Sequence, residues 1–375
     1  MIAWGVWVGG LIAGSWYMAR LRRLPSVDSD DPMQRSADRQ VSIVIPARNE
    51  AANLERLLAS LGAACSGAQV IVVDDASTDD TSVVARAHGA SVVRNDGDPP
   101  PGWTGKTYAC QRGADVATGR VLVFLDADVT LHDRAIDRVV AALDAQGGLV
   151  SVQPYHAVHR PHEQLSAVCN AVTMMGSGAF AAWPRPRRPV AFGPCLASTR
   201  ADYVATGGHS SVAGEVVEDV QLARRYAEHG LPTTVFAGRD TISFRMYPHG
   251  VVQLIEGWSK NLTSGARLVD PLAAFVAAWW VTSCLALGIG ALDVVVGNRG
   301  SWTGVVSATA GWVAVMLQLR WTLSRIGAFR WWAAVLHPLT LWAFVGLFLR
   351  STWLTLVRRT VRWSGRQIVL NARGR

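Results

Sequence analysis

Four long uncharged stretches, one at the start of the sequence and three after residue 270, constrain the fold of this 375-residue chain more than any other feature. About 20 apolar residues are enough for a helix to cross the hydrocarbon core of a membrane. The stretches are Met1–Ala19, Pro271–Leu292, Gly300–Leu319 and Trp331–Leu349. The first has its positive charges behind it and carries no small-residue cleavage site, so it predicts a retained N-terminal anchor at 1–20 rather than a secretory signal. The others predict two or three membrane segments within 271–353.

The arginines beside these stretches predict the orientation of the chain. Three of them follow the first stretch, at positions 20, 22 and 23, and a basic loop, RWTLSRIGAFR, occupies 320–330. Because basic residues are enriched on the cytoplasmic side, we expect a multi-pass protein of the cytoplasmic membrane with its soluble middle in the cytosol. A full crossing by the last stretch would place the basic tail outside, against the same rule. A break at His337-Pro338 would give a re-entrant or interfacial hairpin instead, and the sequence leaves both alternatives open.

The charge and the cysteines narrow the class of partner. The net charge is +8, and many of the arginines flank the apolar stretches, where anionic headgroups attract them. We therefore expect an anionic membrane surface, and no nucleic acid, as a partner. The five cysteines show no C-x-x-C spacing, which indicates neither a disulfide framework nor a zinc site. The sequence does not indicate an oligomeric state.

The soluble middle alternates short β-rich runs with helical patterns. Strands are expected at 41–45, 70–73, 91–93 and 121–125, and helices near 51–61 and 80–88. This alternation predicts an α/β fold with a mainly parallel sheet. Ligands of such sheets bind beyond the carboxyl ends of the strands, so the residues that follow each strand are the first candidates for a site.

Carboxylates follow two of the expected strands. Asp126 and Asp128 come directly after the run at 121–125 and, being two residues apart in an extended chain, can face one cation together. Mg²⁺ or Mn²⁺ held by one or two carboxylates takes its remaining ligands from water and substrate phosphates. Asp75, after the run at 70–73, can accept a hydrogen bond from a base or ribose. For Asp74 and Asp75 the structural alternative is capping of the next helix.

Lysine is almost absent from the chain. Only Lys106 and Lys260 are lysines among the 36 basic residues, and they lie in GWTGK and GWSK, shortly after a Gly-Trp pair. An ammonium group is a compact point charge on a flexible stem, which a planar guanidinium cannot replace everywhere. The two lysines are therefore candidates for specific contacts, with chance as the alternative.

Several motifs carry a resemblance to a known family. IPARNEAANL, VVDDASTDDT, GKTYACQRGA, LDADV and VVED resemble family 2 glycosyltransferases of the GT-A fold. SVQPYH, AFGP, DYVATGGH, FRMYPHG, EGWSKNLTSGA, HPL and WSGRQ narrow the resemblance to a membrane-bound branch that contains diaponeurosporenoate glycosyltransferases and hopanoid-associated relatives. The resemblance covers nearly the whole chain from residue 41. It implies a cytosolic GT-A domain at 41–255 and an amphipathic acceptor-side segment at 256–270. The residues themselves predict a linker at 21–40, which contains a Pro/Asp/Ser-rich stretch, and a basic, arginine-rich tail at 354–375.

The resemblance implies a role for individual residues. The nucleotide pocket would contain Pro46, Arg48, Glu50 and Asp75, and the metal ligands would be Asp126 and Asp128. Asp219, in Glu218-Asp219, falls at the position of the catalytic base, and Lys106 at a basic position that faces the diphosphate. On the acceptor side the resemblance implies that Trp258 lines the site. Apart from the resemblance, Lys260 is expected to face the diphosphate, an anionic acceptor or a headgroup, and Trp103 to supply a second flat apolar wall, with interfacial anchoring as the alternative for the tryptophans. GWSKN replaces the Q-x-x-R-W form, which weakens any analogy with processive polysaccharide synthases.

These roles imply an inverting transfer of a hexose to a membrane lipid. The expected donor is a UDP-sugar, UDP-glucose, with Mg²⁺ or Mn²⁺ as cofactor, and the expected acceptor is a carotenoid, apocarotenoid or other isoprenoid lipid. Two alternatives are transfer to a polyprenyl phosphate and a non-catalytic protein that binds nucleotide sugar or lipid. A carboxylic acid acceptor, with a reference pKa of roughly 4, needs little help from a base, so Asp219 favours a lipid alcohol, whereas the branch implies a lipid acid.

Two further patterns lie largely outside the family motifs; only His156, at the end of SVQPYH, belongs to one of them. His156, His159 and His162 recur every third residue, for which we expect a surface turn rather than a zinc site. The uncharged stretch from Gln164 to Trp183 is compatible with an interfacial helix that leads lipid toward the site or with a buried helix of the domain.

Overall fold

A computed structural model describes residues 2–27, 40–64, 67–132, 134–183, 188–297, 301–358, 360–363 and 366–369. Most of the predicted linker, the end of the predicted tail and Cys65 lie outside these residues. The chain forms two compact units. The sheet unit contains residues 22–155 and 189–245, and the helical unit contains residues 1–21, 156–188 and 246–375.

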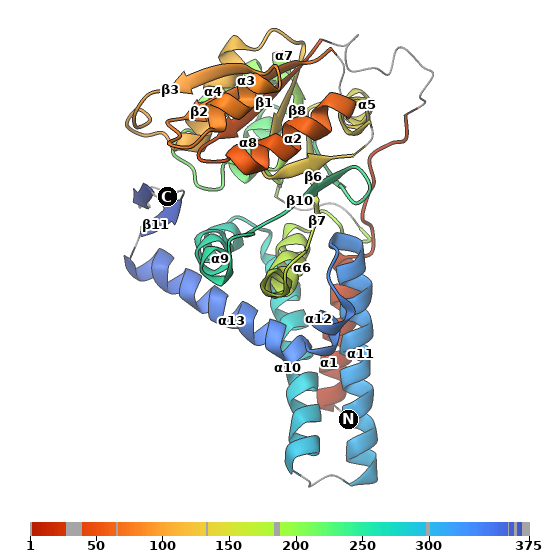
Figure 1. Cartoon of the computed structure of the whole chain (residues 1–375). Helices are drawn as coiled ribbons and strands as arrows, with labels where there is room; N and C mark the ends of the chain where they lie inside the picture. The colour runs from red at the N-terminus through yellow and green to blue at the C-terminus, as the bar shows by residue number, and fades with distance from the viewer. Residues whose placement is uncertain are drawn as a thin grey trace. The chain divides into compact units, whose positions relative to one another are not determined.

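A seven-stranded sheet forms the centre of the sheet unit, with the strand order β3-β2-β1-β4-β8-β6-β9 (Figure 1). Its strands are β1 Val41–Ala47, β2 Gln69–Asp75, β3 Ser91–Asn95, β4 Val121–Leu125, β6 Leu149–Gln153, β8 Cys195–Thr199 and β9 Thr233–Ala237. All neighbouring strands are parallel except β8, which is antiparallel to both β4 and β6. A short strand, β5 Val129–Leu131, pairs antiparallel with β10 Ile242–Phe244. The mainly parallel α/β fold and all four strands expected from the sequence are confirmed.

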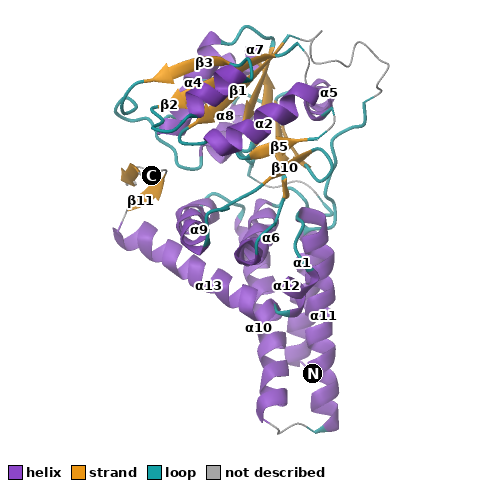
Figure 2. Ribbon diagram, in the orientation of Figure 1, coloured by secondary structure: helices purple, strands orange, loops and turns teal. Residues whose placement is uncertain are grey.

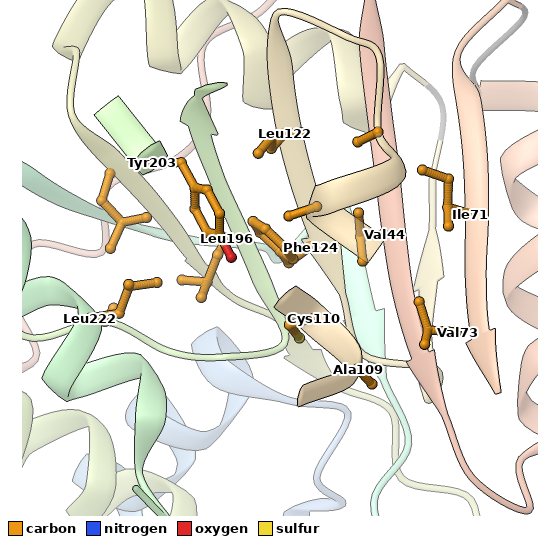
Figure 3. Packing of buried hydrophobic residues seen from close by; sticks show 14 of the residues in the cluster. Val44, Ile71, Val73, Ala109, Cys110, Leu122, Phe124, Leu196, Tyr203 and Leu222 are labelled. Carbon is orange, nitrogen blue, oxygen red and sulfur yellow. The ribbon is translucent and has the colours of Figure 1, made fainter. Parts of the chain in front are cut away.

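The helices of this unit connect successive strands. They are α2 Ala51–Ala64, α3 Thr81–Ala87, α4 Gly105–Val116, α5 Ala135–Gln146, α7 Arg200–Ala205 and α8 Glu218–Glu228, with a 3₁₀ turn at Gly208–Val212. The helices expected near 51–61 and 80–88 are α2 and α3. Strand residues such as Val44, Ile71 and Phe124 are buried among side chains of α4, α7 and α8 (Figure 3). These strands read as continuous apolar runs because helices cover the sheet.

The helical unit is built from α1 Ile2–Tyr17, α6 Ser166–Ser177, α9 Val251–Ala266, α10 Pro271–Gly297, α11 Trp302–Ile326, α12 Trp331–Val335 and α13 His337–Trp353 (Figure 2). Shorter elements are a 3₁₀ turn at Pro161–Leu165, a π-helical turn at Leu354–Arg358 and an antiparallel pair, β11 Thr360–Trp363 and β12 Arg366–Val369. The strand β7, Tyr155–His156, lies where the chain passes from one unit to the other. Three helical segments, 271–291, 302–326 and 337–357, are long and apolar enough to cross a membrane.

Small residues bring α1 close to α10. A Cβ atom on Gly10 would overlap the Ser283 hydroxyl, and one on Gly14 would overlap the Trp280 ring. Two helices can approach this closely only where side chains are absent, and glycines four residues apart are a common means of such close packing. The first apolar stretch is therefore one helix of a bundle.

Gln318 connects three helices of the same bundle. Its Nε2 donates hydrogen bonds to the Leu11 carbonyl and to Ser15 Oγ (2.7 Å) on α1. Its Oε1 accepts a hydrogen bond from Trp280 Nε1 on α10 (2.8 Å). Seven residues later on α11, Arg325 donates hydrogen bonds to the carbonyls of Met18 (2.7 Å) and Ala19 (3.1 Å). These two residues lie just beyond the end of α1, where no further helical turn supplies amide donors.

The last apolar stretch is broken at His337-Pro338. α12 ends at Val335 and α13 begins at His337, so a single straight helix from Trp331 to Leu349 does not form. The His337 ring packs on Trp312 of α11, with 4.5 Å between ring centroids, which places the start of α13 beside the middle of α11. Near the other end of α13, Ser351 Oγ accepts a hydrogen bond from the Thr263 amide of α9 (3.0 Å). α13 thus runs obliquely from the middle of the bundle to α9 (Figure 1).

Two of the remaining expectations concern the segment before α6 and α6 itself. The surface turn expected for the three histidines is wrong for His156, which is fully buried and packs edge-on against Phe329 (5.2 Å between centroids). His159 is exposed, as expected, because the chain has left β7 there. α6 has mostly buried side chains and packs against α9, α10 and α13, so it belongs to the helical unit.

Candidate active site

The predicted residues of the sheet unit lie at one edge of the sheet. Arg48 and Glu50 follow β1, Asp75 ends β2, and Asp126 and Asp128 follow β4. Because β2, β1 and β4 are parallel neighbours, their carboxyl ends meet at this edge. Lys106 joins them from the first turn of α4, and Glu218 and Asp219 join them from the first turn of α8, as the contacts below show.

Lys106 is held between two carboxylates. Its Nζ lies 2.7 Å from Asp126 Oδ1 and 2.9 Å from Glu218 Oε1. The helix start that carries it is fixed by a capping box, in which Thr104 and Thr107 exchange side-chain and backbone hydrogen bonds. Burial lowers the pKa of Lys106, but Asp126 and Glu218 raise this pKa well above its ordinary value. The ammonium group therefore keeps its charge.

Asp219 is oriented by two backbone amides. Its Oδ2 accepts a hydrogen bond from the Gly193 amide (2.7 Å) and its Oδ1 accepts one from the Val220 amide (2.8 Å). Burial, together with the neighbouring Glu218 carboxylate, raises the pKa of Asp219 to about 7. A carboxylate with a pKa near neutral pH is suited to accept a proton and release it again.

Gly193 separates Lys106 from Asp219. A Cβ atom at this position would lie 3.2 Å from Lys106 Nζ and 3.3 Å from Asp219 Oδ2. A side chain there would therefore press on both groups. The motif AFGP, recognised in the sequence only as a mark of the branch, thus has a place in the site.

The carboxylates near β1 and β4 suit a divalent cation. Burial, together with the neighbouring charges of Asp126 and Glu50, raises the pKa of Asp128 to about 8. Burial also raises the pKa of Glu50, with a contribution from Asp126. A cation between Asp126 and Asp128 would relieve this repulsion. No group of three or more metal-binding side chains occurs in the described part of the chain, so the remaining ligands would come from phosphate or water.

The two aspartates at the end of β2 have different surroundings. Asp74 accepts hydrogen bonds from the Ser77 amide (2.8 Å) and the Ser82 hydroxyl, so it holds the turn and the start of α3. Asp75 is buried beside Arg48, whose guanidinium donates to the Asp75 carbonyl (2.8 Å) and lies 3.7 Å from its carboxylate. Neither residue performs the capping role considered for it, because the N-cap position of α3 is occupied by Asp80 and Asp74 bonds the turn before the helix and a side chain of its first turn. Pro46 lies within β1, one strand away.

The predicted acceptor residues are divided between the units. Trp103 precedes α4 in the sheet unit and packs edge-on against Tyr108 (5.6 Å between centroids). Trp258 lies on α9 of the helical unit, where it is only 5% exposed and donates from Nε1 to Ser166 Oγ (2.9 Å). Lys260 follows on the same helix. The Ser166 contact fixes Trp258 against the start of α6, and its contact with an acceptor stays a prediction.

One functional partner was missed from the sequence. Glu218 was noted only as the neighbour of the predicted base, yet its carboxylate binds Lys106 directly. The two adjacent acidic side chains at the start of α8 point to different partners, Glu218 to Lys106 and Asp219 to the Gly193 amide. Adjacent acids in VVED were the available signal, but the sequence did not say which cation they face.

Comparisons with known proteins identify the family. Residues 42–167 match the model of the glycosyl transferase family 2. A 4,4'-diaponeurosporenoate glycosyltransferase of Staphylococcus aureus (strain USA300) is 35% identical over 331 residues, which cover 87% of this chain and 88% of the relative. The chain belongs to the family 2 glycosyltransferases. The protein of the same name from Staphylococcus haemolyticus is 36% identical over 284 residues, which cover 74% of this chain and 75% of that protein.

Among solved structures, a mannosyltransferase from Pyrobaculum calidifontis in complex with GDP-Man and Mn²⁺ aligns with a TM-score of 0.47 and 19% identity, over 90% of this chain and 95% of that one. Glucosyl-3-phosphoglycerate synthase from Mycobacterium tuberculosis, in complex with Mn²⁺, UDP and glucosyl-3-phosphoglycerate, aligns with a TM-score of 0.46 and 22% identity, over 66% of this chain and 88% of that one.

Proposed function

We propose that this family 2 glycosyltransferase is an integral membrane protein that transfers glucose from UDP-glucose, with inversion, to an isoprenoid lipid. The observation that carries the proposal is the arrangement at the sheet edge, where Lys106 lies between Asp126 and Glu218 and Gly193 separates it from Asp219. A fixed cation and a basic carboxylate are the two groups that a displacement at an anomeric carbon requires. Membership of the family sets aside the non-catalytic alternative.

The leaving group is a nucleoside diphosphate, which gains negative charge as the glycosidic bond breaks. Lys106 is a fixed cation next to the metal-binding carboxylates, and such preorganised charges stabilise the transition state because they need no rearrangement. Mg²⁺ or Mn²⁺ held by Asp126 and Asp128 would neutralise further charge on the diphosphate. Pro46, Arg48, Glu50 and Asp75 would form the nucleotide pocket along the same edge.

Asp219 would act as the base of a single displacement. Its two oxygens are held by backbone amides, and its pKa of about 7 leaves a large deprotonated fraction in the cytosol. It would take the proton of a hydroxyl acceptor as the oxygen attacks, a contribution typically worth about 10²–10⁴-fold. An acid acceptor is already ionised and would need Asp219 far less.

The acceptor is proposed from the helical unit and the relatives. Three apolar helical segments give the protein access to membrane lipids. The two relatives are named for a carotenoid acid, so we propose an apocarotenoid acid as the first acceptor to test. The raised pKa of Asp219 favours a lipid alcohol as the second candidate.

We also propose that α12 and α13 form a re-entrant hairpin. α13 starts beside the middle of α11 and ends beside α9, so it does not run the length of the bundle. The basic tail would then stay on the cytosolic side, as the positive charges require. Cysteine labelling of an exposed tail position in sealed vesicles would test this topology.

The test of the function uses the full chain in lipid nanodiscs with UDP-glucose and three acceptors: an apocarotenoid acid, the matched alcohol and a polyprenyl phosphate. We expect glucosylation of the acid or the alcohol, detected by mass. Asp219→Asn should lower transfer to the alcohol by about 10²–10⁴-fold and transfer to the acid much less. Turnover of the polyprenyl phosphate alone would establish that alternative, and an equal loss with both lipids would assign Asp219 another role.

A further inference from the structure

Asn95 ends β3 with a buried amide group that the fold does not use. Asn95 is only 6% exposed, and neither its Nδ2 nor its Oδ1 has a hydrogen-bond partner among the described residues. Buried side-chain amides are nearly always hydrogen-bonded, because an unpaired buried polar atom loses its contact with water without compensation. Two unpaired atoms on one side chain therefore call for a ligand.

The strand register places this amide beside Asp75. β2 and β3 are parallel, and Asp75 is aligned with Asn95. Successive side chains of a strand point to opposite faces, so aligned residues of neighbouring strands share a face. The preceding pair, Asp74 and Arg94, meets on the other face, where the guanidinium lies 3.6 Å from the carboxylate. Asp75 and Asn95 consequently lie side by side on the face opposite to that ion pair.

Arg48 completes the edge. It donates to the Asp75 carbonyl (2.8 Å), and its own Nε is buried without a hydrogen-bond partner in the described part of the chain. Three polar side chains, Arg48, Asp75 and Asn95, therefore lie together at the carboxyl ends of the neighbouring strands β1, β2 and β3. All three belong to the sheet unit.

The chemistry of the pair selects a class of base. An ionised carboxylate only accepts hydrogen bonds, whereas an amide both donates and accepts. A base edge that carries a ring N–H beside a carbonyl gives a donor to Asp75 and an acceptor to Asn95 Nδ2. Uracil (N3–H with O4) and guanine (N1–H with O6) have this pattern. Cytosine and adenine present an unprotonated ring nitrogen instead, which would face the carboxylate without a proton between them.

We propose that Asn95 reads the nucleobase of the donor, by hydrogen bonding to the carbonyl next to a ring N–H that Asp75 accepts. The inference rests on the proposed function, because it places a nucleotide sugar at this edge. It adds a specificity-determining residue that none of the sequence motifs pointed to.

The test compares diphosphates that differ only in the base. Inhibition constants of UDP, GDP, CDP and ribose 5-diphosphate are measured for the full-length wild type in nanodiscs, for Asn95→Ala and for Asn95→Asp. The control is Ser91→Ala, at the exposed start of the same strand. Asn95→Ala should weaken the preferred diphosphate, UDP or GDP, by about 10-fold, the loss of roughly one hydrogen bond to a buried partner. Ribose 5-diphosphate should bind to this variant as it does to the wild type.

Asn95→Asp should weaken the binding of the preferred diphosphate more than Asn95→Ala does. It replaces the amide donor with a second carboxylate beside Asp75, which cannot donate to the carbonyl of the base. The proposal is overturned if the ratio of UDP or GDP affinity to CDP affinity in Asn95→Ala stays within twofold of the wild-type ratio. A uniform loss with all four compounds also overturns it, since that is what a merely structural role produces. Wild type that binds no nucleotide diphosphate would instead refute the proposed function, so the two failures are distinguishable.

Discussion

Replacing Lys106 tests whether a fixed cation at the sheet edge drives catalysis. Its Nζ contacts Asp126 and Glu218 at 2.7 and 2.9 Å. At an effective dielectric constant of about 20, each contact corresponds to a gross attraction of about 6 kcal/mol, most of which is offset by desolvation. Lys106→Met leaves both carboxylates without this cation. We expect kcat to fall by about 10²–10³-fold, or ~2.7–4 kcal/mol, as when one preorganised charge stabiliser is removed.

Lys106→Arg keeps the charge and tests the shape of the site. An arginine would place its guanidinium carbon near the present Nζ and would need room for two more nitrogens, but a Cβ at Gly193 would already be only 3.2 Å from Nζ. We therefore expect kcat to fall by roughly 10-fold or more. Arg86→Lys on α3, which is exposed, is the matched control and should leave kcat unchanged.

The assay is UDP release coupled to glucosylated lipid measured by mass, with thermal unfolding as a check on folding. Because about a quarter of the Lys106 and Asp126 side chains is exposed, we expect Lys106→Met to cost about 1–3 kcal/mol of stability, less than a fully buried pair. The reasoning is refuted if folded Lys106→Met keeps kcat within threefold of wild type. Equal and small effects of Lys106→Arg and Arg86→Lys would show that the lysine is interchangeable with arginine.

Three further predictions concern the metal, the base and the helix bundle. Asp128→Asn or excess chelator should nearly abolish transfer without unfolding the protein, and full activity in chelator would exclude the metal. With a lipid alcohol, kcat/KM should rise with pH through about 7 and then level off, because Asp219 acts only when deprotonated; Asp219→Asn should remove this dependence. Gly14→Leu should reduce the free energy of unfolding by about 1–3 kcal/mol, measured as a lower unfolding temperature, because the new side chain overpacks against Trp280. Gly5→Leu, at a position with open space around it, should leave the unfolding temperature unchanged.

The sheet unit was predictable because its signals are local. Apolar runs such as VSIVI and VLVFL are buried on both faces. Asp126 follows VLVFL directly, and Arg48 and Glu50 lie within five residues of VSIVI, so the strands and the edge that carries these side chains could be predicted together. The contacts of Lys106 were not predictable in detail. Its partner Glu218 lies more than 100 residues away in the chain, and only the folded sheet brings α4 and α8 to the same edge.

The helical unit shows the same contrast. Composition alone located the apolar stretches, because the length of a membrane-spanning helix is fixed by the bilayer. It did not show that Gly10 and Gly14 face α10 or that Gln318 binds α1, since both depend on which helices become neighbours. The three-residue spacing of the histidines also predicted a surface turn that includes His156, although its ring is buried against Phe329.

The contacts of α1 have a consequence for the order of synthesis. The helix leaves the ribosome about 250 residues before α10, and Gln318 of α11 follows later still. At ~5–20 residues per second, the first helix waits roughly 10–50 s for the neighbours that fill its glycine face and bind its Leu11 and Met18 carbonyls. During that interval the nascent chain holds a 16-residue helix with no partner. Nascent chains halted before residue 271 should therefore be the ones most readily removed by membrane proteases.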